Sequence, residues 1–341
     1  MDMKIQFAFY PLYVTYNHGI ALLSALCKNY AIETELYVLD NVDSYLNNLK
    51  DNDATLIGFS CVTEEDMVKC LPFIKVAIES GKEVLLGGVY ARRNQDIAIK
   101  GCRICHGDGE TLPLYIINRD EDRLFRVPLY QHDLNNLPLP DYELFKNIPF
   151  DRDFVFIRNQ TILPYHSSRG CVFACKFCEV SIQASGVRIR SKVEKDLTYL
   201  KEKYNPDIIY IADALPPVYS KSWRESWGNM SYPFISYIRA DFKDEWLEWL
   251  INRGMVGAMF GVESGDEEYR NKELGKKLSD DAVWKTIEIL NSNGVKYAAF
   301  FMEDTPNEKY HQKKETLKMM DSIQNKNGFV VKYQYKNLLG V

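Results

Sequence analysis

Short strand-like runs alternate with helical patterns along most of the chain, and this alternation restricts the possible folds more than any other feature. Residues 1–115 contain five apolar or β-branched runs bounded by turn residues or charges. They are Lys4–Tyr10, Ile32–Val38, Ala54–Cys61, Glu83–Leu86 and Cys102–His106. Because strands joined through helices form right-handed crossovers, this part is predicted to be a Rossmann-like open parallel sheet covered on both faces. Ligands of such sheets bind outside the carboxyl ends of the strands.

The alternation stops at residues 116–152 and then resumes. This segment contains NRDEDR and LPLPDYELF, and Pro138 and Pro140 favour an extended linker because proline is excluded from helix interiors. Six more strands are predicted, at Thr161–Tyr165, Asp207–Ala212, Phe234–Arg239, Val256–Gly261, Lys296–Phe301 and Phe329–Tyr335. Six strand–helix units favour a partial (β/α)6 barrel over residues 153–341 rather than a closed eight-fold barrel. The predicted fold class is therefore α/β, with an open sheet followed by a partial barrel.

Two helix ends of the second half have local signals. Ser191 and Glu194 have the spacing of a capping box, which predicts that a helix begins there. A helix over Asp244–Arg253 is predicted to end at Gly254, since glycine is the residue that most often follows a helix.

The composition limits the classes of protein to consider. The chain has 341 residues, 46% hydrophobic and 26% charged, as expected of a soluble protein with two domains. A formal charge of −5 argues against a nucleic-acid substrate. No apolar run approaches the ~20 residues that span a bilayer, and the start lacks the pattern of a signal peptide. We therefore expect a cytoplasmic protein without a membrane partner, whose eight cysteines bind metal or pack as thiols rather than form disulfides.

Three of the cysteines form the most informative motif. Cys171, Cys175 and Cys178 lie in SSRGCVFACKFCE, directly after a predicted strand, with the spacing C-x3-C-x2-C. Three thiolates from one loop can converge on a four-iron cluster and leave one iron open to bind a substrate. The alternatives are three structural thiols or part of a zinc site. Zinc would require a fourth close ligand, for which only His166 is nearby.

With this motif, residues 153–335 resemble the radical S-adenosylmethionine (SAM) superfamily. The resemblance implies that Cys171, Cys175 and Cys178 hold a [4Fe–4S] cluster whose open iron is chelated by SAM. It also implies an external one-electron reductant, whose electron cleaves SAM to methionine and a 5′-deoxyadenosyl radical.

Further family motifs imply which residues bind SAM. The resemblance places Phe177 near the adenine, Asp213 of IIYIADA at the methionine ammonium and Glu263 of FGVESGDEE at the ribose. Arg239 of SYIRADF matches a third-strand arginine of the family, and LGKKLSDDA, with Lys276 or Lys277, follows the family pattern as well. Taken one at a time, Asp213 could equally be a helix cap, Arg239 half of a surface ion pair and Glu263 a turn carboxylate.

The fifth-strand motif departs from the family. The usual Gly-x-Pro-x-Glu is replaced by a sequence that begins at Asp304 and ends at Glu308. An aspartate adds a side chain where the backbone of the family approaches SAM, so the geometry of that edge is left open.

Residues 1–115 and the linker resemble the cobalamin-binding domain that precedes many radical SAM cores. The matching segments are YNHGIALLSALCK, LLGGVYARR, GDGETL and LPLPDYELF. The resemblance implies cobalamin contacts from the loop Ser60–Glu65 and from glycines whose missing Cβ lets a flat ligand approach. The candidate residues are Ser60, Thr63, Gly87, Gly88, Gly107 and Gly109. The Asp-x-His-x-x-Gly motif is missing and Tyr90 replaces a common histidine, so a domain that has lost cobalamin is the alternative.

These motifs predict a radical SAM enzyme, and within that family a cobalamin-dependent methyltransferase acting on an unactivated carbon. One alternative is a radical SAM rearrangement, cyclisation or epimerisation with a vestigial cobalamin domain. Others are a non-catalytic cobalamin or metal-binding sensor and a zinc-ribbon-like interaction protein. A small molecule or peptide is the favoured substrate, and no residue is assigned to hydrogen abstraction or acid–base catalysis.

Overall fold

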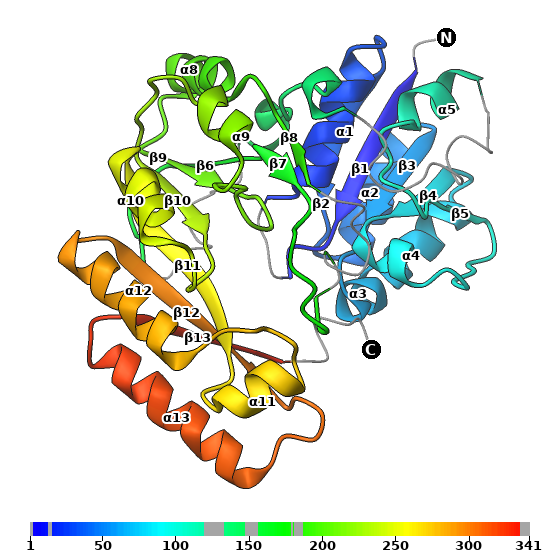
Figure 1. The fold of residues 1–341 in the computed structure, drawn as a ribbon. Helices are drawn as coiled ribbons and strands as arrows, with labels where there is room; N and C mark the ends of the chain where they lie inside the picture. Colours follow the sequence, from blue (N-terminus) through cyan, green and yellow to red (C-terminus); the bar gives the residue numbers. More distant parts are fainter. Residues whose placement is uncertain are drawn as a thin grey trace. The chain divides into compact units, whose positions relative to one another are not determined.

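The protein is described from a computed structural model, which covers residues 3–12, 16–118, 133–146, 156–178, 180 and 187–334. The chain divides into two compact units (Figure 1). The described residues up to 146 form the first unit, and those from 156 to 334 form the second. No helix in these described ranges is long and apolar enough to cross a membrane.

The first unit is a five-stranded parallel sheet, as predicted, and its strands follow the order β2-β1-β3-β4-β5. Its strands are β1 (Lys4–Phe9), β2 (Glu33–Val38), β3 (Leu56–Ser60), β4 (Glu83–Gly87) and β5 (Cys102–Ile104). Its helices are α1 (His18–Lys28), α2 (Val42–Asp51), α3 (Glu64–Glu79), α4 (Val89–Arg93) and α5 (Leu112–Asn118). Because β1 lies between β2 and β3, the order of the strands reverses at β1, which is the kind of position where such sheets bind ligands.

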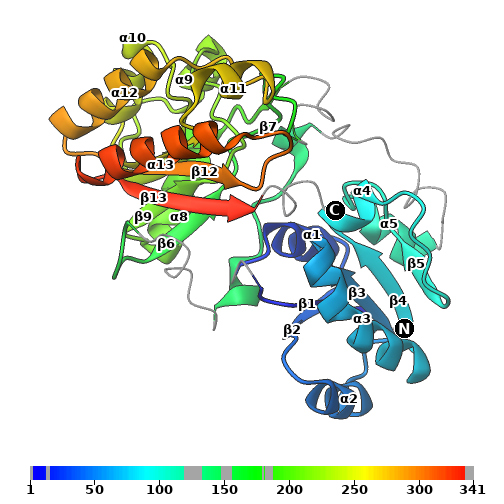
Figure 2. The ribbon, with the colours of Figure 1, turned by 90° about the horizontal axis from the view of Figure 1, so that it is seen from below.

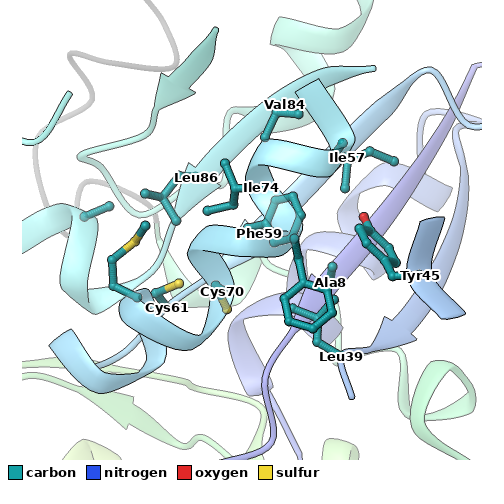
Figure 3. Packing of buried hydrophobic residues seen from close by; sticks show 14 of the residues in the cluster. Ala8, Leu39, Tyr45, Ile57, Phe59, Cys61, Cys70, Ile74, Val84 and Leu86 are labelled. Carbon is teal, nitrogen blue, oxygen red and sulfur yellow. The ribbon is translucent and has the colours of Figure 1, made fainter. Parts of the chain in front are cut away.

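One core of the first unit lies between the sheet and the helices α2 and α3 (Figure 3). Phe59 of β3 and Leu86 of β4 pack with Ile74 and Cys70 of α3, and all four are almost inaccessible to solvent. Cys102 packs at the edge of this core. Its pKa is raised by burial to about 12, so at neutral pH it is a protonated thiol. Burial likewise raises the pKa of Cys105 to about 11. Both cysteines therefore behave as packed thiols in this structure.

Where the structure describes the predicted linker, over residues 133–146, the segment packs on the first unit. Leu134 and Leu137 pack against Leu22 of α1, and the segment forms two 3-10 turns, η1 (Leu134–Asn136) and η2 (Tyr142–Phe145). Asp141 is ion-paired with Lys28 at 2.6 Å. These two leucines, which precede Pro138, bury apolar area on α1, and this contact fixes the segment to the first unit. That unit therefore extends well beyond residue 115; the rest of the predicted linker, apart from the end of α5, lies outside the described residues.

The second unit is a six-stranded parallel sheet in the order β13-β12-β11-β10-β9-β6. Its strands are β6 (Ile162–Tyr165), β9 (Ile208–Ile211), β10 (Phe234–Tyr237), β11 (Met255–Glu263), β12 (Lys296–Glu303) and β13 (Phe329–Gln334). Its helices are α8 (Val193–Tyr204), α9 (Lys221–Ser226), α10 (Asp244–Asn252), α11 (Glu267–Lys272), α12 (Asp280–Ser292) and α13 (Tyr310–Gln324). α12 and α13 lie against β12 and β13 in both views (Figure 1, Figure 2). Every strand pairs with the next in chain order, and β6 and β13 are the two edges, which confirms the partial (β/α)6 barrel.

The two predicted helix ends have different outcomes. The capping box of Ser191 and Glu194 is wrong: the N-cap of α8 is Lys192, which makes no side-chain capping bond. Glu194 instead accepts a hydrogen bond from the backbone N–H of Asn229 at 3.1 Å. The end of α10 is confirmed, because Gly254 follows the helix with φ of 102°. A Cβ there would lie 2.5 Å from the carbonyl oxygen of Tyr232, so only glycine fits.

Candidate functional site

The three-cysteine loop begins beyond the carboxyl end of β6. It is entered through a short antiparallel ladder of β7 (Ser168–Arg169) with β8 (Arg188–Ile189). Gly170 then turns the chain with φ of 97° just before Cys171. Cys175 is buried, Cys171 and Cys178 are half-buried, and all three are free thiols. The backbone N–H of Cys178 donates to the carbonyl of Cys175 at 3.1 Å, which closes a turn between these two residues.

The three thiols are near neighbours. Burial raises the pKa of Cys171, and the charges of Cys178 and Cys175 raise it further. Within the described residues, no three His, Cys, Asp or Glu side chains converge on one metal-ion position. A four-iron cluster does not require such a point, because each thiolate binds a different iron. Three thiolates from one partly exposed loop are a donor set that fits a [4Fe–4S] cluster.

Asp213, just beyond the carboxyl end of β9, anchors the entry to this loop. Its carboxylate accepts hydrogen bonds from the backbone N–H of Ser167 at 2.8 Å and of Ser168 at 3.0 Å. The hydroxyls of the same two serines donate to it at 2.5 and 2.7 Å. Burial raises the pKa of Asp213 to about 6. Four donors occupy the carboxylate, so its role in this structure is to hold the loop; its contact with the SAM ammonium stays a prediction.

Arg239 follows β10 and connects the cysteine loop to the segment after α11. Its Nη1 lies 3.8 Å from Sγ of Cys175, and its Nη2 donates to the carbonyl of Lys276 at 2.5 Å. Asp241 pairs with the guanidinium at 2.8 Å. The ring of Phe173 lies 3.9 Å below the guanidinium carbon. The arginine is therefore buried in the cysteine loop, which excludes a surface ion pair as its only role.

A second contact holds the same two segments together. The backbone N–H of Lys176 donates to the carbonyl of Leu274 at 3.0 Å, and Nζ of Lys176 donates to the carbonyl of Lys272 at 2.7 Å. A Cβ on Gly275 would lie 3.0 Å from the side chain of Lys176, so this crossing is close.

Glu263, the last residue of β11, is the centre of a buried polar group. Nζ of Lys276 donates to its Oε1 at 2.6 Å, and the hydroxyl of Tyr333 donates to its Oε2. The ammonium of Lys276 lies 5.6 Å from the ring centroid of Phe177. Glu263 has φ of 75°, an uncommon value for a residue other than glycine, so its carboxylate is placed at the cost of backbone strain. The structure thus brings the predicted Phe177, Glu263 and Lys276 together.

Tyr333 is the member of this group that sequence reasoning missed. Burial raises its pKa, and the charge of Glu263 adds to this effect. The phenol therefore stays protonated and donates to the carboxylate. Burial also raises the pKa of the neighbouring Tyr237 to about 12. The position of Tyr333 near the carboxyl end of the last predicted strand is the sequence feature that could have indicated this role.

The unusual fifth-strand motif keeps the backbone that glycine would adopt. Asp304 has φ of 56°, a left-handed value that aspartate tolerates better than most residues. Its side chain is 62% exposed and lies 3.7 Å from Nζ of Lys313. Thr305 donates to Glu308 at 3.1 Å within the same turn. The replacement of glycine by Asp304 therefore adds its side chain toward solvent.

The first unit has a separate, mostly apolar cavity at the carboxyl ends of β1, β3 and β4. Five of the six residues predicted for cobalamin line it: Ser60, Gly87, Gly88, Gly107 and Gly109. Its charged residues are Arg92 and Asp108, which lie 3.5 Å apart. Thr63 is not in the lining, because its hydroxyl caps α3 by accepting from the backbone N–H of Asp66 at 3.1 Å.

The adjacent residues Gly87 and Gly88 differ in how strictly the backbone requires glycine. Gly88 has φ of 94°, and a Cβ would lie 2.4 Å from the carbonyl oxygen of Cys61. The fold itself thus requires glycine at 88, whatever the cavity binds. A Cβ on Gly87 would meet only the Cβ of Cys105, at an ordinary contact distance of 3.7 Å.

Comparisons with known proteins agree with this geometry. The family model of the radical SAM superfamily matches residues 165–320. A curated relative, an uncharacterized methyltransferase of Synechocystis sp., is 25% identical over 275 residues, which are 73% of this chain and 48% of the relative. The chain thus spans about half the length of the curated relative that it matches.

Among solved structures, the radical SAM methyltransferase TsrM from Kitasatospora setae, with tryptophan substrate and a SAM analog bound, has a similar fold. The TM-score is 0.70 at 12% identity, over 98% of this chain and 73% of that chain. The family match includes the whole three-cysteine loop, and residues 165–320, a little under half of the chain, are similar to the radical SAM superfamily.

Proposed function

We propose that this protein is a radical SAM methyltransferase that uses a [4Fe–4S] cluster held by Cys171, Cys175 and Cys178. The observation behind the proposal is the loop that presents these three free thiols within the part of the chain that matches the family. When bound, the cluster would supply the electron that cleaves SAM. The electron itself would come from an external one-electron reductant.

The residues around the loop suit the binding of SAM. Glu263 presents a carboxylate, fixed by Lys276 and Tyr333, that can accept hydrogen bonds from ribose hydroxyls. Phe177 offers a ring face for an adenine. The carbonyl groups of Lys276 and Lys277 are both engaged by Arg239, which holds this wall of the site rigid. Burial of these groups would exclude water from a reactive radical.

Methyl transfer is favoured by the relatives. The curated relative is named a methyltransferase, and the solved structure that matches almost the whole chain is a radical SAM methyltransferase. Reactions of another outcome, such as rearrangement or cyclisation, remain the alternative within the family. We propose an unactivated carbon of a small molecule or peptide as the methyl acceptor.

Cobalamin is the proposed methyl carrier. The cavity of the first unit lies at the strand ends where open parallel sheets bind ligands, and its apolar lining suits a large flat ligand. Ser60, Gly87, Gly88, Gly107 and Gly109 would contact it. When bound, cobalamin would accept and release the methyl group.

Anaerobic purification and reconstitution test the proposal. We expect iron and sulfide in the protein, a corrin absorbance after incubation with cobalamin, and 5′-deoxyadenosine when SAM and dithionite are added. With a substrate and SAM labelled in its methyl group, the label should enter the substrate. Reductive cleavage without a corrin would favour another radical SAM outcome. A corrin without any SAM cleavage would favour a sensor, and zinc without sulfide would contradict the proposal.

A further inference from the structure

Arg239 contacts one of the three thiols that are predicted to hold the cluster. Its Nη1 lies 3.8 Å from Sγ of Cys175, a distance at which an N–H donates to sulfur. The arginine is only 6% exposed, and a guanidinium stays charged under all ordinary conditions. A permanent positive charge is therefore fixed beside one of the three predicted cluster ligands.

The other two nitrogens of the Arg239 guanidinium are already engaged. Nε and Nη2 donate to the two carboxylate oxygens of Asp241 at 2.8 and 3.0 Å. Nη2 also donates to the carbonyls of Lys276 and Lys277 at 2.5 and 3.2 Å. Phe173 covers one face of the guanidinium. Most of the guanidinium is thus occupied by the protein, which leaves the contact with Cys175 as its distinctive feature.

A fixed cation beside a thiolate has a defined effect on a cluster. One-electron reduction adds one negative charge to the iron–sulfur unit and its thiolates. A nearby positive charge, and an N–H donated to a ligand sulfur, both stabilise the reduced form. Asp241 lies on the far side of the same guanidinium and is 28% exposed, so its negative charge opposes this effect more weakly.

We propose that Arg239 is a positioning residue that raises the reduction potential of the cluster through Cys175, and that Asp241 moderates it. Arg239 orients its charge toward the ligand sulfur because the ion pair and the two carbonyls hold it in place. This inference rests on the cluster of the proposed function. It differs from the SAM-binding role that the family resemblance implies for this arginine.

The test measures the potential without SAM. The full chain and its variants are reconstituted anaerobically, and the reduced cluster is followed by electron paramagnetic resonance during a redox titration. We expect Arg239→Gln to lower the equilibrium constant for reduction at least tenfold, a shift of about 59 mV to more negative potential. Asp241→Asn should shift the potential the other way, by less. Arg239→Lys, which keeps the charge, should lie between wild type and Arg239→Gln.

Shifts of the reduction potential in opposite directions for the Arg239 and Asp241 variants distinguish an effect of charge from a disturbance of the loop. If both variants shift the potential in the same direction, a structural effect explains them and the proposal is wrong. An unchanged potential in Arg239→Gln, with weaker binding of SAM, would assign the arginine to SAM and also overturn it. If Arg239→Gln fails to hold iron, Asp241→Asn decides, since the proposal requires a more positive potential there. A wild-type protein without iron and sulfide would refute the proposed function itself.

Discussion

The carboxyl ends of the parallel strands carry different kinds of residue in the two units. In the second unit these ends carry buried charged side chains, among them Asp213, Arg239 and Glu263, and each is bound to a named partner. In the first unit the corresponding edge is a mostly apolar cavity with several glycines. Buried charges are costly unless they are paired, so they indicate chemistry more sharply than an apolar cavity does. The second unit can therefore be assigned from its side chains, whereas the ligand of the first must be tested.

The largest expected effect is the loss of the iron–sulfur cluster, which only the three cysteines of the second unit should cause. Alanine at Cys171, Cys175 or Cys178 should abolish cluster binding and reductive SAM cleavage, because each thiolate holds a different iron. Cys102→Ala removes a packed thiol of the first unit and should leave iron, sulfide and 5′-deoxyadenosine unchanged. Iron and sulfide analysis with a 5′-deoxyadenosine assay checks both. If a variant of Cys171, Cys175 or Cys178 still cleaves SAM, these thiols do not differ in function from the packed thiol of Cys102.

The buried pair of Glu263 and Lys276 should give the largest loss of stability. Both side chains are less than a tenth exposed, so Glu263→Gln leaves a buried ammonium without its carboxylate. Breaking a buried pair in this way costs about 3–5 kcal/mol. All five tryptophans, Trp223, Trp227, Trp246, Trp249 and Trp284, lie in the second unit, so their fluorescence during urea unfolding reports that unit alone.

The double variant Glu263→Gln/Lys276→Met is the control for that prediction. It removes both charges and should recover a large part of the lost stability. If the double variant is as unstable as the single one, the loss comes from packing or from Tyr333 rather than from the unpaired charge.

Two neighbouring glycines of the first unit, Gly87 and Gly88, test which residues at its cavity are required by the fold and which are not. Gly88→Ala forces a Cβ against the carbonyl of Cys61 at a positive φ, which should destabilise that unit by about 2–3 kcal/mol. Gly87→Ala meets only an ordinary contact and should leave stability unchanged while adding a methyl group at the cavity. Hydrogen exchange of β3 and β4, together with corrin binding, measures the two effects. Equal protection in both variants would show that the fold does not need Gly88.

Most of the strands could be predicted because parallel strands covered by helices appear as apolar or β-branched runs bounded by turn residues. Each of the eleven predicted strands lies within two residues of an observed one, including the edge strand β2, none of whose residues is buried. The three cysteines were equally visible, since their spacing is local. What could not be predicted depends on tertiary contacts: Leu134 and Leu137 on α1, Glu194 turned toward Asn229, and the hydroxyl of Tyr333 on Glu263.

The smallest expected effect concerns the pH dependence of Asp213. Burial raises its folded-state pKa to about 6, above its ordinary value of 3.8, so the native state binds a proton that the unfolded chain does not bind in this range. Ionisation of Asp213 therefore lowers stability as the pH rises through about 6, and stability is regained as the pH falls toward 4. Asp213→Asn does not titrate, so the stability of wild type relative to this variant should increase between pH 7 and pH 5. Tryptophan fluorescence during urea unfolding at several pH values measures the difference. A constant difference would mean that the four donors from Ser167 and Ser168 compensate fully for burial, and Asp213 would then resemble an exposed carboxylate in its titration.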